Sequence, residues 1–275
     1  MSRAPAIVCL TDFGARDWYA GTLKGVLAAR APGIPLIDLT HEIPPQDVRA
    51  GAIVLAAAAP WFPRGTVFLA VVDPGVGTGR ALLAAHAGGR FFVGPDNGLL
   101  SLALAPHRKR AIVRLTRAEY WQPEISRTFH GRDILAPVAA HLAKGGALRA
   151  LGPSALPQAA PLWPPVQPWR DGWRGNIIHI DAFGNLLTNL PAPPFNMAQG
   201  GVPSRSRGAP RGGRAVVRFR GHRVPMVSSY AAGSPRQLVA VVNSLGLVEL
   251  AIRNGSAVGR FRARRGEPVA LDVSC

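Results

Sequence analysis

The chain has 275 residues, of which 48% are hydrophobic and 17% are charged, and this composition excludes a wholly disordered protein. A chain of this length predicts about two domains. The formal net charge is +17, but the arginines that supply most of it are spread along the chain without interleaved aromatic residues or a recognised binding motif. We therefore expect a solvated basic surface and no nucleic-acid partner.

The first half of the sequence alternates short apolar runs of β-forming residues with longer runs of helical periodicity. Strands are expected at residues 6–10, 35–39, 66–72, 81–85, 90–93 and 111–115, and helices at 18–30, 47–61 and 133–144. Alternation of this kind predicts βαβ units. We therefore expect an α/β N-terminal domain over residues 1–155, with a mostly parallel sheet flanked by helices on both faces.

The second part of the sequence loses this helical periodicity after a Pro-rich linker at residues 156–172. Short strands are expected at residues 176–180, 215–219, 239–242, 248–252 and 268–273. These features predict a smaller, all-β C-terminal domain over residues 173–275. Within it, residues 191–213 are rich in Pro, Gly, Ser and Arg and predict a long mobile loop.

The two cysteines, Cys9 and Cys275, cannot form a disulfide framework, and the sequence has no CxxC pair for a metal. We therefore expect a reducing compartment and no metal site. The apolar run before Asp12 is too short for a secretory signal, and the apolar residues 50–63 are too few to span a bilayer. A cytoplasmic protein without membrane association is the interpretation that these features favour.

Acidic, glycine and other polar residues follow several of the predicted strands, where open α/β sheets bind their ligands. These segments are residues 11–14, 38–41, 72–80 and 94–98. Each segment taken alone is typical of a turn. Residues 75–79 are glycine-rich but have neither the P-loop spacing nor the dinucleotide-binding spacing, so we reject both nucleotide fingerprints.

A further segment, residues 128–133, places a histidine, an arginine and an aspartate at the start of a predicted helix. A functional site and a simple helix cap by Asp133 explain it equally well. In the second domain, Asp181 and Asn185 follow a predicted strand, and a hairpin turn explains that pair. It does not explain the further polar groups at 243–244, Glu249 and 253–255.

Taken in chain order, these segments resemble the S-adenosyl-L-methionine (SAM) hydroxide adenosyltransferase family, whose relatives include the SAM-dependent fluorinase and chlorinase. The segments that carry the resemblance are TDFG with Asp17 and Lys24-Gly25, DLTH, VVDPGVGTGR, GPDNGLL, TFHGRD, IDAFGN with LTN, and NS with RNGSA. Seven motifs in this order over nearly the whole chain are far more specific than any one of them. The resemblance implies an N-terminal α/β domain, a C-terminal β-barrel, and a homotrimer whose active sites lie between the N-terminal domain of one subunit and the C-terminal domain of the next.

The resemblance also implies a reaction, in which SAM and water give adenosine and L-methionine by in-line attack of an activated water or hydroxide at the ribose 5′ carbon. SAM is then the substrate, and no cofactor or metal is implied. Asp73, Arg80 and His130 match the family's water-activating residues. The substrate-binding positions that match are Asp12 for the ribose, Asp17, Asp181 and Ser244 for the methionine, and Asn185, Arg253 and Asn254 near the adenine.

Two other functions fit parts of the sequence. A SAM-dependent halogenase is one alternative, but the halogenating relatives lack the trio of Asp73, Arg80 and His130 and instead carry hydroxyl side chains in a halide pocket. The trio therefore favours hydroxide as the nucleophile. A non-catalytic SAM- or adenosine-binding module is the other alternative, and such a module has no need of water-activating residues. At two positions the chain departs from the fluorinase, with Leu187 in place of a tryptophan and Leu245 in place of an arginine.

Overall fold

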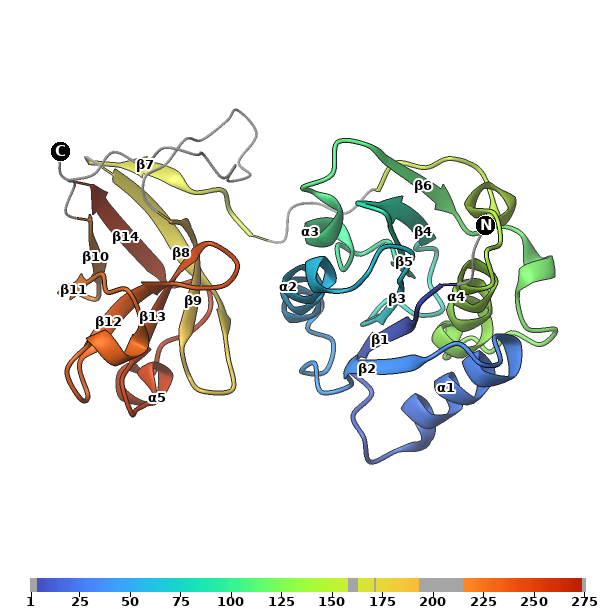
Figure 1. The fold of residues 1–275 in the computed structure, drawn as a ribbon, viewed down its shortest axis with the longest axis horizontal. Coiled ribbons are helices and arrows are strands. Elements are labelled where there is room, and N and C mark those ends of the chain that lie inside the picture. The colour runs from blue at the N-terminus through green and yellow to red at the C-terminus, as the bar shows by residue number, and fades with distance from the viewer. Residues whose placement is uncertain (1–3, 158–162, 171, 193–214, 274–275) are drawn as a thin grey trace. The chain divides into compact units, whose positions relative to one another are not determined.

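The computed structural model describes residues 4–157, 163–170, 172–192 and 215–273. The predicted loop at residues 191–213 lies outside the described residues from position 193 onward. The chain divides into two compact units, Met1–Leu162 and Trp163–Cys275, which agrees with the expected two-domain organisation (Figure 1). The division falls inside the segment predicted as the linker. That segment also contains regular structure, because a short strand, β7 (Gln167–Trp169), pairs with β8.

The N-terminal unit is built on a six-stranded sheet with strand order β2-β1-β3-β5-β4-β6. Its strands are β1 (Ile7–Thr11), β2 (Leu36–Thr40), β3 (Val67–Val71), β4 (Leu82–Ala87), β5 (Arg90–Pro95) and β6 (Arg110–Arg114). Strands β2, β1, β3 and β5 are parallel, but β4 is antiparallel to both β5 and β6. Strand β6 therefore runs in the same direction as β5, so the sheet is mostly parallel, as predicted, and β4 alone is reversed, which makes the sheet mixed. The reason is local: Gly88 and Gly89 both have positive φ, and a tight two-residue turn of this kind returns the chain antiparallel to itself.

Helices cover both faces of this sheet, as predicted. They are α1 (Trp18–Arg30), α2 (Val48–Ala58), α3 (Ser101–Leu104) and α4 (Ala136–Ala143). Ile7 and Cys9 of β1 pack into a core with α1 and α4, whereas the alternate residues Val8 and Leu10 pack into a second core with α2 and α3. Because both faces of β1 are buried, the strand is a continuous apolar run.

The helix predicted at residues 133–144 begins differently in the structure. A π-helical turn, Gly131–Leu135, precedes α4. Pro137 has no N–H, so it cannot donate to the carbonyl of Asp133 four residues earlier. The backbone N–H of Gln122 donates to that carbonyl instead, at 2.8 Å. The proline thus accounts for the irregular first turn, which follows His130 directly.

The C-terminal unit is an antiparallel sheet with the strand path β11-β10-β14-β8-β9-β13-β12. These strands are β8 (Gly172–Ile180), β9 (Leu186–Pro191), β10 (Ala215–Phe219), β11 (His222–Pro225), β12 (Leu238–Val242), β13 (Leu247–Ile252) and β14 (Pro268–Val273). The sheet is barrel-like and nearly closed, because Met226 after β11 bridges to Ala240 of β12. Sequence analysis missed β7, β9, β11, α3 and a short helix, α5 (Ala257–Phe261). None of the helices in the described part of the chain has the length and apolar character needed to cross a bilayer.

Candidate active site

A cavity of about 220 Å³ opens at the carboxyl ends of β1 and β3. Asp12 directly follows β1, and Asp73 lies two residues after the end of β3. His130 approaches from the segment before the π-helical turn. The described residues that line the cavity are Asp12, Phe13, Gln46, Val71, Asp73, Pro74, Val76, Thr128, Phe129, His130 and Gly131. Three sequence-predicted site residues from distant parts of the chain therefore line one cavity.

Arg80 joins two of these residues. Its Nε donates a hydrogen bond to Asp73 Oδ1 at 2.7 Å, and its Nη2 donates to Asp73 Oδ2. The same Nη2 donates to His130 Nδ1 at 3.1 Å. Only 6% of the Asp73 side chain and 10% of the Arg80 side chain are exposed, so water screens this ion pair weakly.

The glycine-rich segment after β3 positions Arg80 over Asp73. Val76 N donates to Asp73 O at 3.1 Å, and Thr78 Oγ1 donates to Gly75 O at 2.7 Å, so the chain turns back on itself. Gly77 has a φ of +80°, and a Cβ there would lie 2.6 Å from the carbonyl oxygen of Arg127. The glycine is required for both reasons. This segment is thus a turn that returns Arg80 to Asp73.

The hydrogen bond from Arg80 determines the tautomer of His130. A guanidinium only donates, so His130 Nδ1 is the acceptor and the neutral ring carries its proton on Nε2. Burial lowers the pKa of His130 from its ordinary value of 6.5, and the charge of Arg80 lowers it further, while Asp73 and Asp133 act in the opposite direction. His130 is therefore neutral at pH 7, with its Nε2–H as a donor.

A backbone N–H of a neighbouring loop holds the carboxylate of Asp12. Its Oδ2 accepts from Gln46 N at 2.8 Å. Burial raises the pKa of Asp12, and the nearby charge of Asp73 raises it too. The loop that carries Asp12 is fixed by Thr11, whose Oγ1 lies 2.8 Å from His41 Nδ1. Sequence analysis missed Gln46, because its contribution comes from a backbone N–H and leaves no side-chain signature.

The charged residues of two other motifs have structural partners. Lys24 Nζ donates to Asp38 Oδ2 at 2.8 Å, which ties α1 to β2. Asp133 is 1% exposed and accepts from Arg132 Nε at 2.5 Å and from Ser126 N at 2.8 Å. These bonds order the segment that precedes the π-helical turn. Of the residues in the 128–133 motif, His130 lines the cavity and Asp133 supports the segment that carries it.

Aromatic rings form one wall of the cavity. Phe129 lies 5.6 Å from Phe13 and 5.3 Å from Tyr19, measured between ring centroids. Phe13 and Phe129 belong to sequence motifs that were identified for their polar residues, and the aromatic letters themselves were the available signal. Asp17 caps the first turn of α1 by position but makes no capping hydrogen bond to the described helix. It is exposed and does not line this cavity.

The predicted site residues of the C-terminal unit lie in its turns. Asp181 Oδ1 accepts from Phe183 N at 2.9 Å and from Asn185 N at 2.8 Å, and Asn185 Nδ2 donates to Asp181 Oδ2 at 3.0 Å. This pair therefore closes the turn between β8 and β9, as the hairpin interpretation predicted. Phe183 at the tip of the turn is 80% exposed.

The remaining predicted residues, Ser244, Arg253 and Asn254, flank β13. Ser244 is exposed in the turn before this strand, whereas Arg253 and Asn254 follow its end. Arg253 Nη1 donates to Ala231 O at 3.1 Å and to Gly233 O at 2.9 Å. Since Leu250 pairs with Leu186, the turn of Asp181 and Asn185 lies at the Arg253 end of β13.

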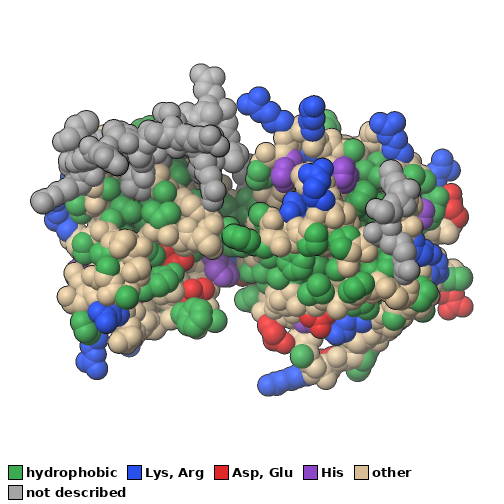
Figure 2. All heavy atoms as spheres, in the orientation of Figure 1, with side chains coloured by type: hydrophobic (Ala, Val, Ile, Leu, Met, Phe, Trp, Pro, Cys, Tyr) green, Lys and Arg blue, Asp and Glu red, His purple; other side chains and the backbone are tan. Residues whose placement is uncertain are grey.

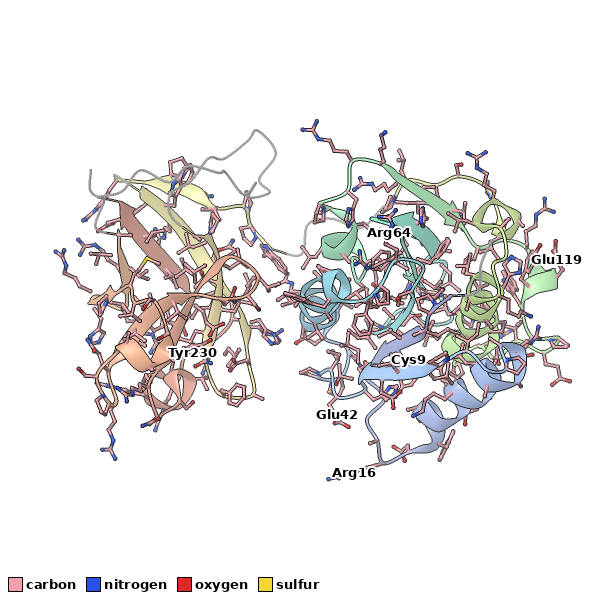
Figure 3. All side chains as sticks on the ribbon, viewed as in Figure 1. Cys9, Arg16, Glu42, Arg64, Glu119 and Tyr230 are labelled. Carbon is pink, nitrogen blue, oxygen red and sulfur yellow. The ribbon has the colours of Figure 1, made fainter. Side chains whose placement is uncertain are left out.

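Sequence analysis also left one buried carboxylate without a role. Glu249 is 7% exposed. It accepts from Tyr230 OH at 2.6 Å and from Asn243 Nδ2 at 3.1 Å (Tyr230 is labelled in Figure 3). Burial raises the pKa of Tyr230, and so does its hydrogen bond to Glu249. Within the described residues, no cluster of three or more His, Cys, Asp or Glu side chains is arranged to hold a metal ion.

Two family models together match nearly the whole length of the sequence. Residues 7–152 match the model of the SAM hydroxide adenosyltransferase N-terminal domain, and residues 175–270 match that of the C-terminal domain. The chain is 40% identical to the (R)-S-adenosyl-L-methionine hydrolase of Thermus thermophilus over 95% of this chain and 97% of the relative. It is 41% identical to the protein of the same name from Salinispora tropica, over 97% of each chain.

More distant relatives include a fluorinase from an Actinoplanes species, which is 28% identical over 90% of each chain. Among solved structures, an uncharacterized conserved protein from Thermotoga maritima superposes with a TM-score of 0.84. It is 30% identical, and the match covers 97% of this chain and 99% of that one.

Proposed function

The chain belongs to the SAM hydroxide adenosyltransferase family, and from this we propose that it hydrolyses SAM to adenosine and L-methionine at the cavity beside Asp73, Arg80 and His130. The single observation that carries this assignment is the arrangement of Arg80, which is hydrogen-bonded to both Asp73 and His130 at the edge of an aromatic-walled cavity. Relatives named as SAM hydrolases match the chain at higher identity than the fluorinase does.

The chemistry explains why these groups are needed. SAM is a sulfonium cation, and attack of hydroxide at its ribose 5′ carbon expels the neutral thioether of methionine. Charge is annihilated as the transition state forms, so a cavity that excludes bulk water favours the reaction. Water itself has a pKa of ~15.7 and is a poor nucleophile at pH 7, so the site must give it hydroxide character.

Each member of the trio has a separate task in this proposal. The guanidinium of Arg80 places a fixed positive charge beside the attacking oxygen and stabilises hydroxide. Asp73 holds that guanidinium in a two-point pair. Its remaining lone pairs accept a hydrogen bond from the attacking water. His130 Nδ1 is occupied by Arg80, so His130 orients the nucleophile by donating from Nε2. The proton released by the overall reaction leaves to solvent.

The other predicted residues position the substrate. Asp12 accepts hydrogen bonds from the ribose hydroxyls, and Asp17, Asp181 and Ser244 hold the amine and carboxylate of the methionine. Asn185, Arg253 and Asn254 lie near the adenine. In-line placement of this kind contributes effective molarities of up to ~10⁵ to 10⁸ M, so these anchors matter as much as the trio. No metal or other cofactor takes part in the proposed reaction, and we expect it to occur in the cytoplasm.

The size of the cavity supports a site completed by a second subunit. A volume of about 220 Å³ is below the ~300 to 1,000 Å³ of pockets that enclose a ligand such as SAM. We therefore propose a homotrimer in which the C-terminal unit of a neighbouring subunit supplies the adenine and methionine contacts. A cyclic, head-to-tail arrangement brings a different surface of each subunit to every interface.

Isotope labelling tests the reaction. The purified protein is incubated with SAM in ¹⁸O-labelled water without added halide. The nucleosides are then separated by chromatography, and their masses are measured by mass spectrometry. Adenosine with ¹⁸O at the 5′ position is expected. Unlabelled adenosine would mean a different nucleophile, and a halogenated nucleoside after addition of chloride or fluoride would support the halogenase alternative.

Mixing two inactive variants tests the composite site. Asp73→Asn removes the N-terminal half of a site, and Asp181→Ala removes the C-terminal half. In randomly mixed cyclic trimers, about one quarter of the sites combine two intact halves, so about a quarter of the activity should return. If each site is built from a single chain, no activity returns on mixing.

A further inference from the structure

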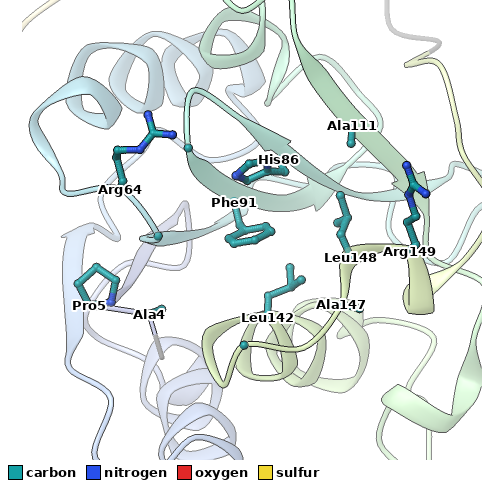
Figure 4. A pocket seen from close by; sticks show the side chains of 13 residues that line it. Ala4, Pro5, Arg64, His86, Phe91, Ala111, Leu142, Ala147, Leu148 and Arg149 are labelled. Carbon is teal, nitrogen blue, oxygen red and sulfur yellow. The ribbon is translucent and has the colours of Figure 1, made fainter. Parts of the chain in front are cut away.

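A second and larger cavity, of about 600 Å³, lies in the N-terminal unit at the opposite ends of the sheet strands (Figure 4). Ala4 and Pro5 precede β1, Gly65 precedes β3 and Phe91 lies near the start of β5, so the cavity adjoins the amino ends of the parallel strands. The proposed hydrolytic site lies at their carboxyl ends. The two cavities share no lining residue.

The interior of this cavity is apolar. Figure 4 shows Phe91 with His86 above it, Leu142 below it and Leu148 to its right. The rings of His86 and Phe91 lie 4.7 Å apart between centroids. Its volume falls within the ~300 to 1,000 Å³ typical of small-molecule pockets, which are mostly apolar and carry a few polar groups that set specificity.

The polar groups around this cavity carry one sign of charge. Arg64 and Arg149 line it, and neither makes a hydrogen bond or ion pair with the described residues. An adjoining hollow of about 510 Å³ also contacts Arg64 and His86 and adds Lys109 and Arg110. None of the described residues that line either hollow is an aspartate or glutamate. In Figure 2, Lys, Arg and His side chains gather on this face of the unit, around the position labelled Arg64 in Figure 3.

Arg64 has a defined position at this rim. Its guanidinium lies against the backbone of Gly89, where an added Cβ would be 2.5 Å from Arg64 Cζ. Because Gly89 has a φ of +79° and no side chain, the guanidinium can lie flat beside the cavity mouth. Burial lowers the pKa of the neighbouring His86, and the positive charge of Arg64 lowers it further.

We propose that this cavity binds a small organic anion whose aromatic or aliphatic body packs on Phe91, Leu142 and Leu148 and whose negative group pairs with Arg64. The apolar surface favours burial of the body. An arginine that is not already paired with a carboxylate of the protein is a strong partner for the carboxylate, sulfonate or phosphate of a ligand. The site is separate from SAM hydrolysis, so its existence does not depend on the proposed function.

A matched pair of fluorescent probes tests this proposal on the full chain. 8-Anilinonaphthalene-1-sulfonate has an apolar body with an anionic group, and N-phenyl-1-naphthylamine has the same body without the charge. We expect saturable binding of the sulfonate at one site per chain and at least about tenfold weaker binding of the neutral probe, which corresponds to ~1.4 kcal/mol. Excess adenosine or SAM should not displace the sulfonate.

Three variants separate this cavity from other binding surfaces. Arg64→Gln should weaken the sulfonate about tenfold and leave the neutral probe unchanged. Arg117→Gln removes the same charge from an exposed position that lines neither hollow, and should change nothing. Ala111→Trp fills the junction of the two hollows and should abolish binding of both probes. An unchanged midpoint in a denaturant titration verifies that each variant is folded.

The proposal is overturned by any of three results. Displacement of the sulfonate by adenosine or SAM would place it in the hydrolytic site. Equal affinity for the two probes, or an effect of Arg117→Gln as large as that of Arg64→Gln, would show that Arg64 does not select an anion. Undiminished binding to a folded Ala111→Trp variant would place the probe elsewhere on the protein.

Discussion

Replacement of Asp73 by asparagine is expected to remove most of the hydrolysis and to leave SAM binding nearly intact. The substitution keeps the shape of the side chain but turns one oxygen into an NH₂ group that faces the donors of Arg80. General-base assistance contributes ~10² to 10⁴ to a rate, and at ~1.36 kcal/mol per factor of ten this equals about 2.7 to 5.4 kcal/mol of barrier. We therefore expect kcat to fall by about 10²- to 10⁴-fold.

The same substitution has a cost in stability that the structure bounds. With 6% of the Asp73 side chain and 10% of the Arg80 side chain exposed, the pair is close to fully buried. Removal of one partner of a buried ion pair costs ~3 to 5 kcal/mol, because the other charge is left uncompensated. Asparagine keeps one oxygen that can still accept from Arg80, so we expect a value near the lower bound.

The assay measures adenosine formation by chromatography at saturating SAM, the Kd of SAM by calorimetry, and the free energy of unfolding by denaturant titration. Asp272→Asn is the matched control, because Asp272 also accepts from an arginine, Arg218, but belongs to no proposed site. That variant should lose some stability and keep its kcat. Near-normal kcat in a folded Asp73→Asn variant at saturating SAM would refute the assigned role of Asp73.

Three further predictions concern pH and stability. Because the pKa of His130 is lowered below 6.5 and its Nδ1 must stay unprotonated to accept from Arg80, the acid limb of kcat/KM should lie below pH 6.5. An acid limb above pH 6.5 that disappears in His130→Gln would contradict this expectation. The stability that neutral His130 contributes should likewise be complete above pH 6.5 and be lost as the pH falls through the lowered pKa of His130. Asp47 Oδ1 accepts from Ala50 N at 3.0 Å at the start of α2, so Asp47→Ala should cost about 0.5 to 2 kcal/mol in a denaturant titration, and an unchanged midpoint would argue against the cap. Tyr230→Phe removes a donor from the buried carboxylate of Glu249 and should destabilise the protein by about 1 to 3 kcal/mol. The double variant that adds Glu249→Leu should recover part of this loss. If the free-energy changes of the two single variants simply add in the double variant, the two side chains do not interact.

Local physics made much of the fold predictable. Helix α1 begins and ends at the predicted residues, and β10 and β14 span their predicted ranges, because apolar periodicity and flanking turn residues are properties of short segments. The missed strands β7, β9 and β11 are short or contain proline. Strands β7 and β11 are stabilised by hairpin pairing with β8 and β10, and β9 pairs with both β8 and the more distant β13. The apolar pattern within each short segment does not contain these contributions.

The chemistry-bearing residues were also accessible from the amino-acid sequence, because aspartates, histidines and glycines that follow strands stand out from an apolar background. Asp12, Asp73 and His130 were identified in this way and through the family resemblance, and they line one cavity. The role of each neighbour was not accessible. Whether Asp133 acts on a ligand or supports a segment depends on its 1% exposure and its bonds to Arg132 and Ser126, which only the folded chain creates.

The direction of β4 has a local cause that the apolar pattern does not contain, because adjacent Gly88 and Gly89 form a tight turn between β4 and β5. Tertiary structure alone decided two other features. The proton position on His130 follows from the approach of Arg80, fifty residues away in the chain. The cavity beside Phe91 and Arg64 arises where the amino ends of several strands meet, and no single segment contains its shape. Periodicity and residue type act within a few residues, whereas cavities and tautomers are set by contacts between segments that only folding brings together.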